Sequence, residues 1–97
     1  MDKYRRGATV PMRSRYWVGS TLTDVDTYTI DIKDETGQLV ITADDAMTDD
    51  AADGTYSYNY TIAATATLGK YTADATLTKD SIVHIPRYIF EVEAAVA

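Results

Sequence analysis

The 97-residue chain has no cysteine and a single histidine. Without cysteine, disulfide bonds, thiolate metal sites and cysteine nucleophiles are excluded, and the fold must be held together by packing alone. The lone histidine, His84, lies in a predicted strand, and no serine stands in the Gly-x-Ser-x-Gly context of a nucleophile elbow. Phosphate-binding glycine strings are absent as well. Because catalysis needs a nucleophile, a base or a metal in a pocket, we expect a protein that is not an enzyme and has no cofactor.

Long hydrophobic runs are also lacking. The basic residues near the N-terminus are followed by no apolar stretch of the kind found in a signal peptide. No segment approaches the ~20 consecutive apolar residues of a membrane-spanning helix. We therefore expect a soluble protein that is made in the cytoplasm without a signal peptide and has no membrane partner.

Positive charge is scarce outside the first fifteen residues. Residues 1–15 hold five basic side chains against Asp2 alone, whereas the rest of the chain holds four basic and 14 acidic side chains, and the net charge is −6. An acidic body disfavours nucleic acid as a partner, because such binding depends on neutralising phosphates. We interpret residues 1–7 as a basic, solvated N-terminal arm.

The period-two alternation typical of β-strands, by contrast, is abundant. In residues 55–62, large apolar side chains at even positions alternate with small polar ones, which predicts one buried face and one wet face. Residues 27–33 and 71–78 alternate in the same way. No window carries the spacing of an amphipathic helix, and the best helical candidate, residues 44–52, is short and acidic.

Three further segments are predicted as less regular strands. Residues 8–18 must form an edge strand or break at Pro11, which has no N–H group. Residues 38–42 follow a turn that ends in glycine. Residues 82–93 form a long last strand that is interrupted at Pro86.

Six or seven strands with turn signals at short intervals predict an all-β domain, a two-sheet antiparallel β-sandwich. The sandwich domain covers residues 8–93, and residues 94–97 form a short apolar tail.

Two junctions between a turn and a strand share the form Gly-x-Tyr: Gly54-Thr55-Tyr56 and Gly69-Lys70-Tyr71. The second resembles the tyrosine corner of immunoglobulin-like and fibronectin-like sandwiches, in which a tyrosine near the start of a strand bonds backwards to the chain. Together with residues 7–12, 26–32 and 34–37, these junctions make the chain similar to bacterial and macroglobulin-like immunoglobulin (Ig) domains. The similarity is greatest to the small Ig-like domains of phage and prophage virion proteins. The chain departs from antibody domains in lacking the cysteine pair and a core tryptophan.

The resemblance implies an Ig-like sandwich that is incorporated into a virion or another assembly. Such a domain would be a non-enzymatic structural module that acts through protein–protein contacts, with a protein partner or by self-assembly. Fold by itself does not determine function, so this implication is an analogy.

The first predicted sandwich strand supplies a candidate interface. The face predicted to be buried carries Val10, Met12, Tyr16 and Val18. Arg13, Arg15 and Trp17 then share the opposite face, and arginine and tryptophan are enriched among residues that dominate binding energy. The alternative is a bulge near Pro11 or Ser14, which would reverse the phase and place Trp17 in the core.

Two other kinds of binding stay open. Calcium would need the carboxylates of an acidic segment, although the segment fails the EF-hand pattern, whose third and twelfth positions hold Ala51 and Tyr60. The carboxylates in question belong to Asp44, Asp45, Asp49, Asp50 and Asp53. The alternative function is a carbohydrate-binding or adhesion module of a surface protein, which predicts at least two exposed aromatic residues near one face or loop end. The strict alternation of tyrosines in residues 55–62 favours a core role for them instead.

Overall fold

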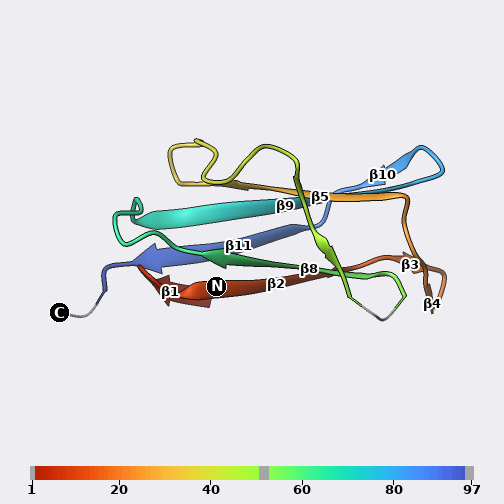
Figure 1. The fold of residues 1–97 in the computed structure, drawn as a ribbon, viewed down its shortest axis with the longest axis horizontal. Helices are drawn as coiled ribbons and strands as arrows, with labels where there is room; N and C mark the ends of the chain where they lie inside the picture. Colours follow the sequence, from red (N-terminus) through yellow and green to blue (C-terminus); the bar gives the residue numbers. More distant parts are fainter. Residues whose placement is uncertain (1, 51–52, 96–97) are drawn as a thin grey trace.

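The computed structural model describes residues 2–50 and 53–95, which form an all-β fold that contains no helix (Figure 1). The strands are β1 (Asp2–Arg5), β2 (Thr9–Arg15), β3 (Trp17–Val18), β4 (Thr21–Leu22), β5 (Thr27–Lys33), β6 (Asp45–Ala46), β7 (Thr48–Asp49), β8 (Thr55–Thr61), β9 (Gly69–Lys79), β10 (Ile82–His84) and β11 (Arg87–Glu93). The predicted all-β class is therefore confirmed. These residues include no helix of the length and hydrophobicity needed to cross a membrane.

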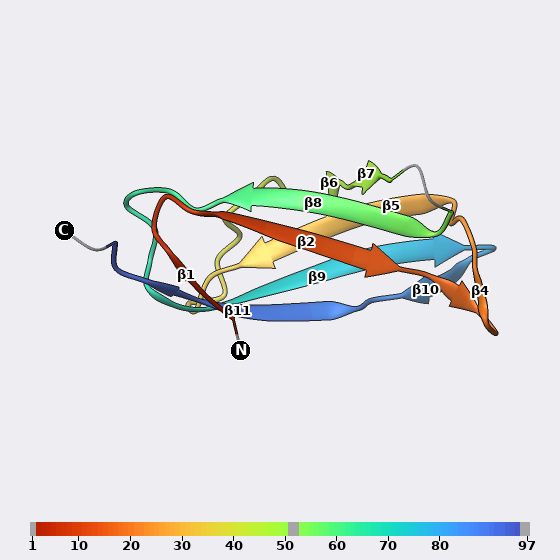
Figure 2. The same cartoon turned by 90° about the horizontal axis from the view of Figure 1, so that it is seen from below.

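The strands pair into one large sheet, one small sheet and a separate hairpin. The large sheet has the order β1-β11-β9-β5-β6, with β10 also paired to β9. The small sheet has the order β2-β8-β7, and β3 pairs with β4 alone. All pairs are antiparallel except β1 with β11, which is parallel. The small sheet lies over one face of the large one, as Figure 2 shows for β2 and β8 above β9 and β11.

The core fills the space between these two layers, and its side chains follow the predicted alternation. On β9, every second residue from Tyr71 to Leu77 is buried, while the residues between them are half-buried. Ile30 and Ile32 of β5 and Phe90 and Val92 of β11 point into the same space. The small sheet contributes Val10, Met12, Tyr56 and Tyr60 from the other side. Burial of this apolar surface is the main stabilising contribution to the fold.

Phe90 is fully buried at the centre of an aromatic cluster. Its ring centroid lies 5.4 Å from that of Tyr71, 5.8 Å from Tyr88, 5.9 Å from Tyr4 and 6.5 Å from Tyr60. These separations fall in the range where aromatic pairs contribute beyond their buried area. We call the part of the molecule that contains these five rings the aromatic half.

Tyr71 also carries the local hydrogen bond that its motif predicts. Its hydroxyl donates to the backbone carbonyl of Thr67, four residues upstream, at 2.6 Å. The preceding Gly69 has a φ of +122°, which few other residues adopt. The sequence Gly-Lys-Tyr thus begins β9 by bending the chain and attaching the tyrosine to the bend.

One of the predicted strands is wrong, and two short strands were not predicted. Residues 38–42 do not form a strand, since Leu39 makes only an isolated bridge to Lys33. The turn before them is as predicted, with Gly37 at a φ of +86° and the Asp34 carboxylate accepting hydrogen bonds from residues 36 and 38. Residues 44–50, part of the best helical candidate but not predicted as a helix, contain the short strands β6 and β7, and residues 51–52 lie outside the described part of the chain.

Two predicted faces also need correction. Thr55 is buried, although it was assigned to the wet face of its strand. The chain around residues 16–24 folds over this strand end: Tyr16 N–H donates to the Gly54 carbonyl, and Gly54 N–H donates to Asp24 Oδ1. Val18 is 53% exposed rather than in the core, because it belongs to the separate β3–β4 hairpin.

The N-terminal arm is part of the sheet. Residues 2–5 form β1 and align in parallel with Phe90–Glu93 of β11, so their interpretation as a solvated arm is wrong. The basic side chains face acidic partners across this pair, with Lys3 3.7 Å from Glu91 and Arg5 3.7 Å from Glu93. Of the predicted tail, Ala94 and Ala95 are exposed and lie beyond the last strand, whereas residues 96–97 lie outside the described residues.

Candidate functional site

Two unpaired sheet edges run along one side of the molecule. β2 is an outer strand of the small sheet, and β10 and β11 form the outer strand of the large sheet where β1 does not cover it. Because β1 pairs only with Phe90–Glu93, the edge over residues 82–89 has no partner strand within the described part of the chain. A hollow of about 420 Å³ opens between the two edges. Its buried lining is apolar and consists of Met12, Ile30, Ala73 and Ala75.

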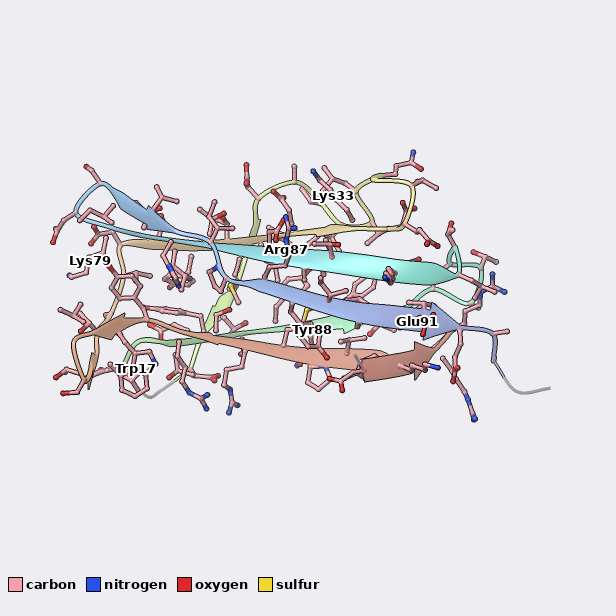
Figure 3. All side chains as sticks on the ribbon, turned by 180° about the vertical axis from the view of Figure 1, so that it is seen from behind. Trp17, Lys33, Lys79, Arg87, Tyr88 and Glu91 are labelled. Atoms are coloured by element: carbon pink, nitrogen blue, oxygen red, sulfur yellow. The ribbon has the colours of Figure 1, made fainter. Side chains whose placement is uncertain are left out.

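A second hollow of about 390 Å³ lies on the same side, toward the β3–β4 hairpin. It is lined by Arg15, Tyr16, Trp17, Ile82, Val83 and His84. Arg15 lines both hollows, so we describe them together as the open groove. In Figure 3, Tyr88 lies between β11 and β2, and Trp17 marks the far end.

Two hairpins bound this far end. The turn between β9 and β10 consists of Asp80 and Ser81, whose φ angles are +50° and +67°. Two successive residues with positive φ give the tight turn whose twist matches that of the flanking strands. The turn between β3 and β4 contains Gly19 at a φ of +60°. We call residues 17–22 and 79–85 the hairpin end.

The hairpin end exposes an unusual amount of apolar surface. Five of its residues are more than half exposed: Trp17 (56%), Val18 (53%), Ile82 (65%), Val83 (55%) and Ile85 (56%). Single exposed apolar residues are common on protein surfaces, but contiguous ones mark interaction sites. Trp17, Ile82 and Val83 are contiguous here, since they line the same hollow.

Arginines line the groove. Arg13 forms an ion pair with Asp50 at 3.1 Å, and Arg87 binds Asp74 through two hydrogen bonds of 2.8 and 3.2 Å. The hydrogen bonds to Asp74 raise the pKa of Arg87 above its usual value, so this guanidinium stays charged. Arg15 makes no ion pair within the described part of the chain, which leaves its charge available to a ligand.

A small polar cluster closes the groove at the aromatic half. The Tyr88 hydroxyl donates to Asp2 Oδ2 at 2.6 Å and lies 3.4 Å from the Tyr4 hydroxyl. Burial raises the pKa of Tyr88, and the hydrogen bonds to Asp2 and Tyr4 raise it further. Tyr88 therefore remains a neutral hydrogen-bond donor that holds the start of β1 against β11.

The structure resolves the alternative left open for Trp17. Trp17 is exposed, and so are Arg13 and Arg15. The three residues line one groove, with Arg13 in the first hollow, Trp17 in the second and Arg15 in both. They do not share a continuous strand, because β2 ends at Arg15 and β3 begins at Trp17.

Sequence reasoning missed the other wall of the second hollow, which β10 provides. Ile82, Val83 and Ile85 are exposed, although they belong to a segment predicted as part of the last strand. A signal was present: apolar residues occupy both parities of this segment, whereas a half-buried strand alternates.

His84 lies in β10, as predicted, and is exposed. Its ring stands 6.2 Å from the ring of Tyr16 in an edge-to-face arrangement. The side-chain hydrogen bonds and ion pairs of the described residues do not involve His84, so the contact that the structure shows for its ring is the one with Tyr16.

Two carboxylates of the acidic segment contact other side chains of the same chain. Asp45 accepts a hydrogen bond from the Tyr58 hydroxyl at 2.7 Å, and Asp50 accepts one from Ser57 while pairing with Arg13. Among residues 2–50 and 53–95, no three potential ligand side chains come together as a metal site.

Comparison with known proteins returns no relative: no family model, no curated protein and no solved structure matches the chain.

Proposed function

We propose that the chain is a non-enzymatic, immunoglobulin-like interaction module, a structural component of a phage or prophage particle that acts through protein–protein contacts. The observation that carries the proposal is the open groove with its exposed hairpin end, where apolar side chains and arginines gather on a small all-β body. The virion assignment rests on the resemblance of the sequence motifs.

The strand pairing supports an Ig-like two-sheet sandwich. In the Ig scheme, strands B, E and D share one sheet and strands C, F and G share the other. Here β2, β8 and β7 would correspond to B, E and D, and β5, β9 and β10–β11 to C, F and G. β6 beside β5 would be the extra strand that variable-type domains add after C. The chain departs from the scheme at β1, which joins the sheet of the G strand.

The hydrogen bond of Tyr71 supports the same assignment. β9 occupies the place of strand F, and the hydroxyl of a tyrosine at its start donates to a backbone carbonyl four residues upstream. This is the arrangement that defines a tyrosine corner.

The composition of the hairpin end supports an interaction role. Tryptophan and arginine dominate binding energy at protein interfaces because each buries a large area and keeps a polar group available. Of the ten aromatic residues, all of which lie in the described ranges, Trp17 alone is exposed. The carbohydrate alternative requires two exposed aromatics, so the single tryptophan favours a protein partner.

Light scattering tests the proposal, with the chain measured alone and then mixed with candidate virion proteins. We expect a complex or a self-assembled species whose formation is weakened by Trp17→Ala. The matched control is Leu39→Ala, which truncates another exposed apolar residue that does not line the groove. A chain that stays monomeric with every candidate, or that assembles equally well without Trp17, contradicts the proposal.

A further inference from the structure

We infer that the free edge of β10 and β11 accepts an extended strand from a partner protein, and that this strand carries alternating apolar and acidic side chains. The inference rests on the proposed interaction function and names the kind of partner. It follows from the direction of the backbone groups at the two edges, from the hollow beside them and from the charge around the groove.

The same alternation of inward and outward backbone groups runs through β10 and β11, although Pro86 lies between the two strands. Ile82 aligns with Lys79, and Arg87 aligns with Asp74, so the register against β9 is the same on both sides of the break. The Pro86 carbonyl accepts from Ala75 N–H at 3.1 Å and therefore points to β9. Its missing N–H would also have pointed to β9, so Pro86 removes nothing from the free edge.

The odd-numbered residues of β10 and β11 direct their backbone N–H and C=O groups away from β9. The Glu93 carbonyl accepts from Arg6 N–H at 3.2 Å on the β1 side of the strand. Because successive residues of a strand alternate in direction, Val83, Ile85 and Arg87 present their N–H and C=O groups at the edge that β1 leaves uncovered. Unpaired groups in such a row are a template for another strand.

The facing edge of β2 is blocked by the other proline. Ile62 N–H donates to the Ala8 carbonyl, and Tyr16 N–H donates to the Gly54 carbonyl, so the even residues of β2 bond to β8. Pro11 has odd parity and lies at the free edge, where its ring removes a donor. Of the two edges, only that of β10 and β11 offers an unbroken row.

β1 shows how an added strand fits. β1 lies on the same edge of the large sheet, beside Phe90–Glu93. Its inward side chain Tyr4 packs against Phe90. The hollow of about 420 Å³ lies at the Asp2 end of β1, where Asp2 and Tyr4 contribute to its lining. A strand that continues the line of β1 would place every second side chain in this hollow, over Met12, Ala73 and Ala75. These inward positions must be apolar, because the buried lining is apolar.

Charge determines the remaining positions. Arg13, Arg15 and Arg87 line the hollow together with Asp2. Arg13 is paired with Asp50 and Arg87 with Asp74, so of the three arginines Arg15 supplies the charge that is unpaired among the described residues. Complementary charge in a partner steers association and suppresses wrong partners. A second copy of this chain fits less well, because its own edge would bring a second hollow instead of the apolar side chains that fill the first.

The test uses amide hydrogen exchange of the full chain, measured residue by residue by nuclear magnetic resonance. The probe is a blocked eight-residue synthetic peptide of alternating valine and glutamate, compared with a valine–lysine peptide of the same length. We expect the amides of Val83, Ile85 and Arg87 to exchange rapidly in the free protein and to become protected by the glutamate peptide. The amide of Tyr88, which points to β9, serves as the internal control and is slow in both states.

Two variants complete the test. Ile85→Pro removes an outward N–H and should weaken binding of the glutamate peptide about tenfold, whereas Ile85→Val keeps that donor and should not. Arg15→Glu leaves the edge intact and should reverse the preference between the two peptides, which keeps the test decisive if Ile85→Pro does not fold. Equal protection by both peptides, or no added protection of the Val83, Ile85 and Arg87 amides, overturns the inference.

Failure here is distinguishable from failure of the proposed function. If light scattering detects assembly that depends on Trp17 while the outward amides stay unprotected, strand addition is wrong and the interaction module stands. If protection appears only together with a dimer of the chain, the occupant is a second copy, and the partner-strand inference is overturned.

Discussion

The aromatic half and the hairpin end are built from the same long strands but bury their side chains to different degrees. In the aromatic half, Phe90 is fully buried under four tyrosine rings, and β1 covers the edge of the sheet. At the hairpin end, Ile82 and Val83 of β10, which pairs with β9 as β11 does, are 65% and 55% exposed. The difference teaches that apolar residues in a strand become core only where the second layer and a neighbouring strand both cover them. Stability should therefore reside in the first region and binding in the second.

The largest expected effect is in the aromatic half. Phe90→Ala should lower the free energy of unfolding by about 3–5 kcal/mol, because it removes a buried ring and leaves a cavity. Val83→Ala, in β10 at the hairpin end, should change the free energy of unfolding by less than about 0.5 kcal/mol. Urea denaturation followed by circular dichroism measures both. Similar values for the two variants would break the comparison.

Alkaline pH should unfold the protein through its tyrosines. Burial is the largest cause of the raised pKa values of Tyr56, Tyr58, Tyr60, Tyr71 and Tyr88. For Tyr58, burial and the hydrogen bond to Asp45 raise the pKa to about 12. A pKa raised on folding contributes stability that is fully present below the unfolded pKa of about 10 and is lost as the pH rises through the folded value.

The measurement is the ultraviolet absorbance of tyrosinate together with circular dichroism, from pH 9 upward. We expect several tyrosines to ionise together with unfolding between about pH 10 and 12. A folded protein in which the five tyrosines with raised pKa values ionise independently near pH 10 would contradict their burial.

A smaller effect is expected at the tyrosine that begins β9. Tyr71→Phe keeps the buried ring but removes the hydrogen bond to the Thr67 carbonyl. The free energy of unfolding should fall by about 0.5–1.5 kcal/mol, the usual net contribution of one such bond. The control is Tyr16→Phe, whose hydroxyl makes no hydrogen bond to another described residue. A loss as large as that of Phe90→Ala would mean that the corner organises more of the fold than one bond.

The smallest expected effect on stability is at Trp17. Because its side chain is 56% exposed, Trp17→Ala should change the free energy of unfolding by less than about 0.5 kcal/mol. The same variant should weaken assembly in the light-scattering experiment, which separates stability from binding. A marked loss of stability would show that Trp17 supports the β3–β4 hairpin and is no free interface residue.

Much of the fold could be predicted from local patterns. The strands around residues 27–33, 55–61 and 71–78 were recognised because each has an apolar residue at every second position. Thr55 and residues 38–42 were mispredicted because long-range contacts decide them: the chain around residues 16–24 covers Thr55, and Leu39 finds only one bridge partner.

The candidate site was predictable only in part. Arg13, Arg15 and Trp17 were found by strand parity and residue type. The opposite wall at Ile82 and Val83 was missed, because the pairing of residues far apart in sequence brings β3 and β10 together. β1 was missed for the same reason, since its partner strand is at the other end of the chain.

The sequence alone determined the all-β class, the inward parity of the tyrosines and aliphatic residues, and the turn at Gly37, because each depends on side-chain alternation or on the conformation of one residue. Tertiary structure alone decided which strand edges remain free and what each proline does there. Pro11 and Pro86 are chemically identical, but one ring points to an open edge and the other toward a neighbouring strand, and that direction depends on which strands pair across the whole chain.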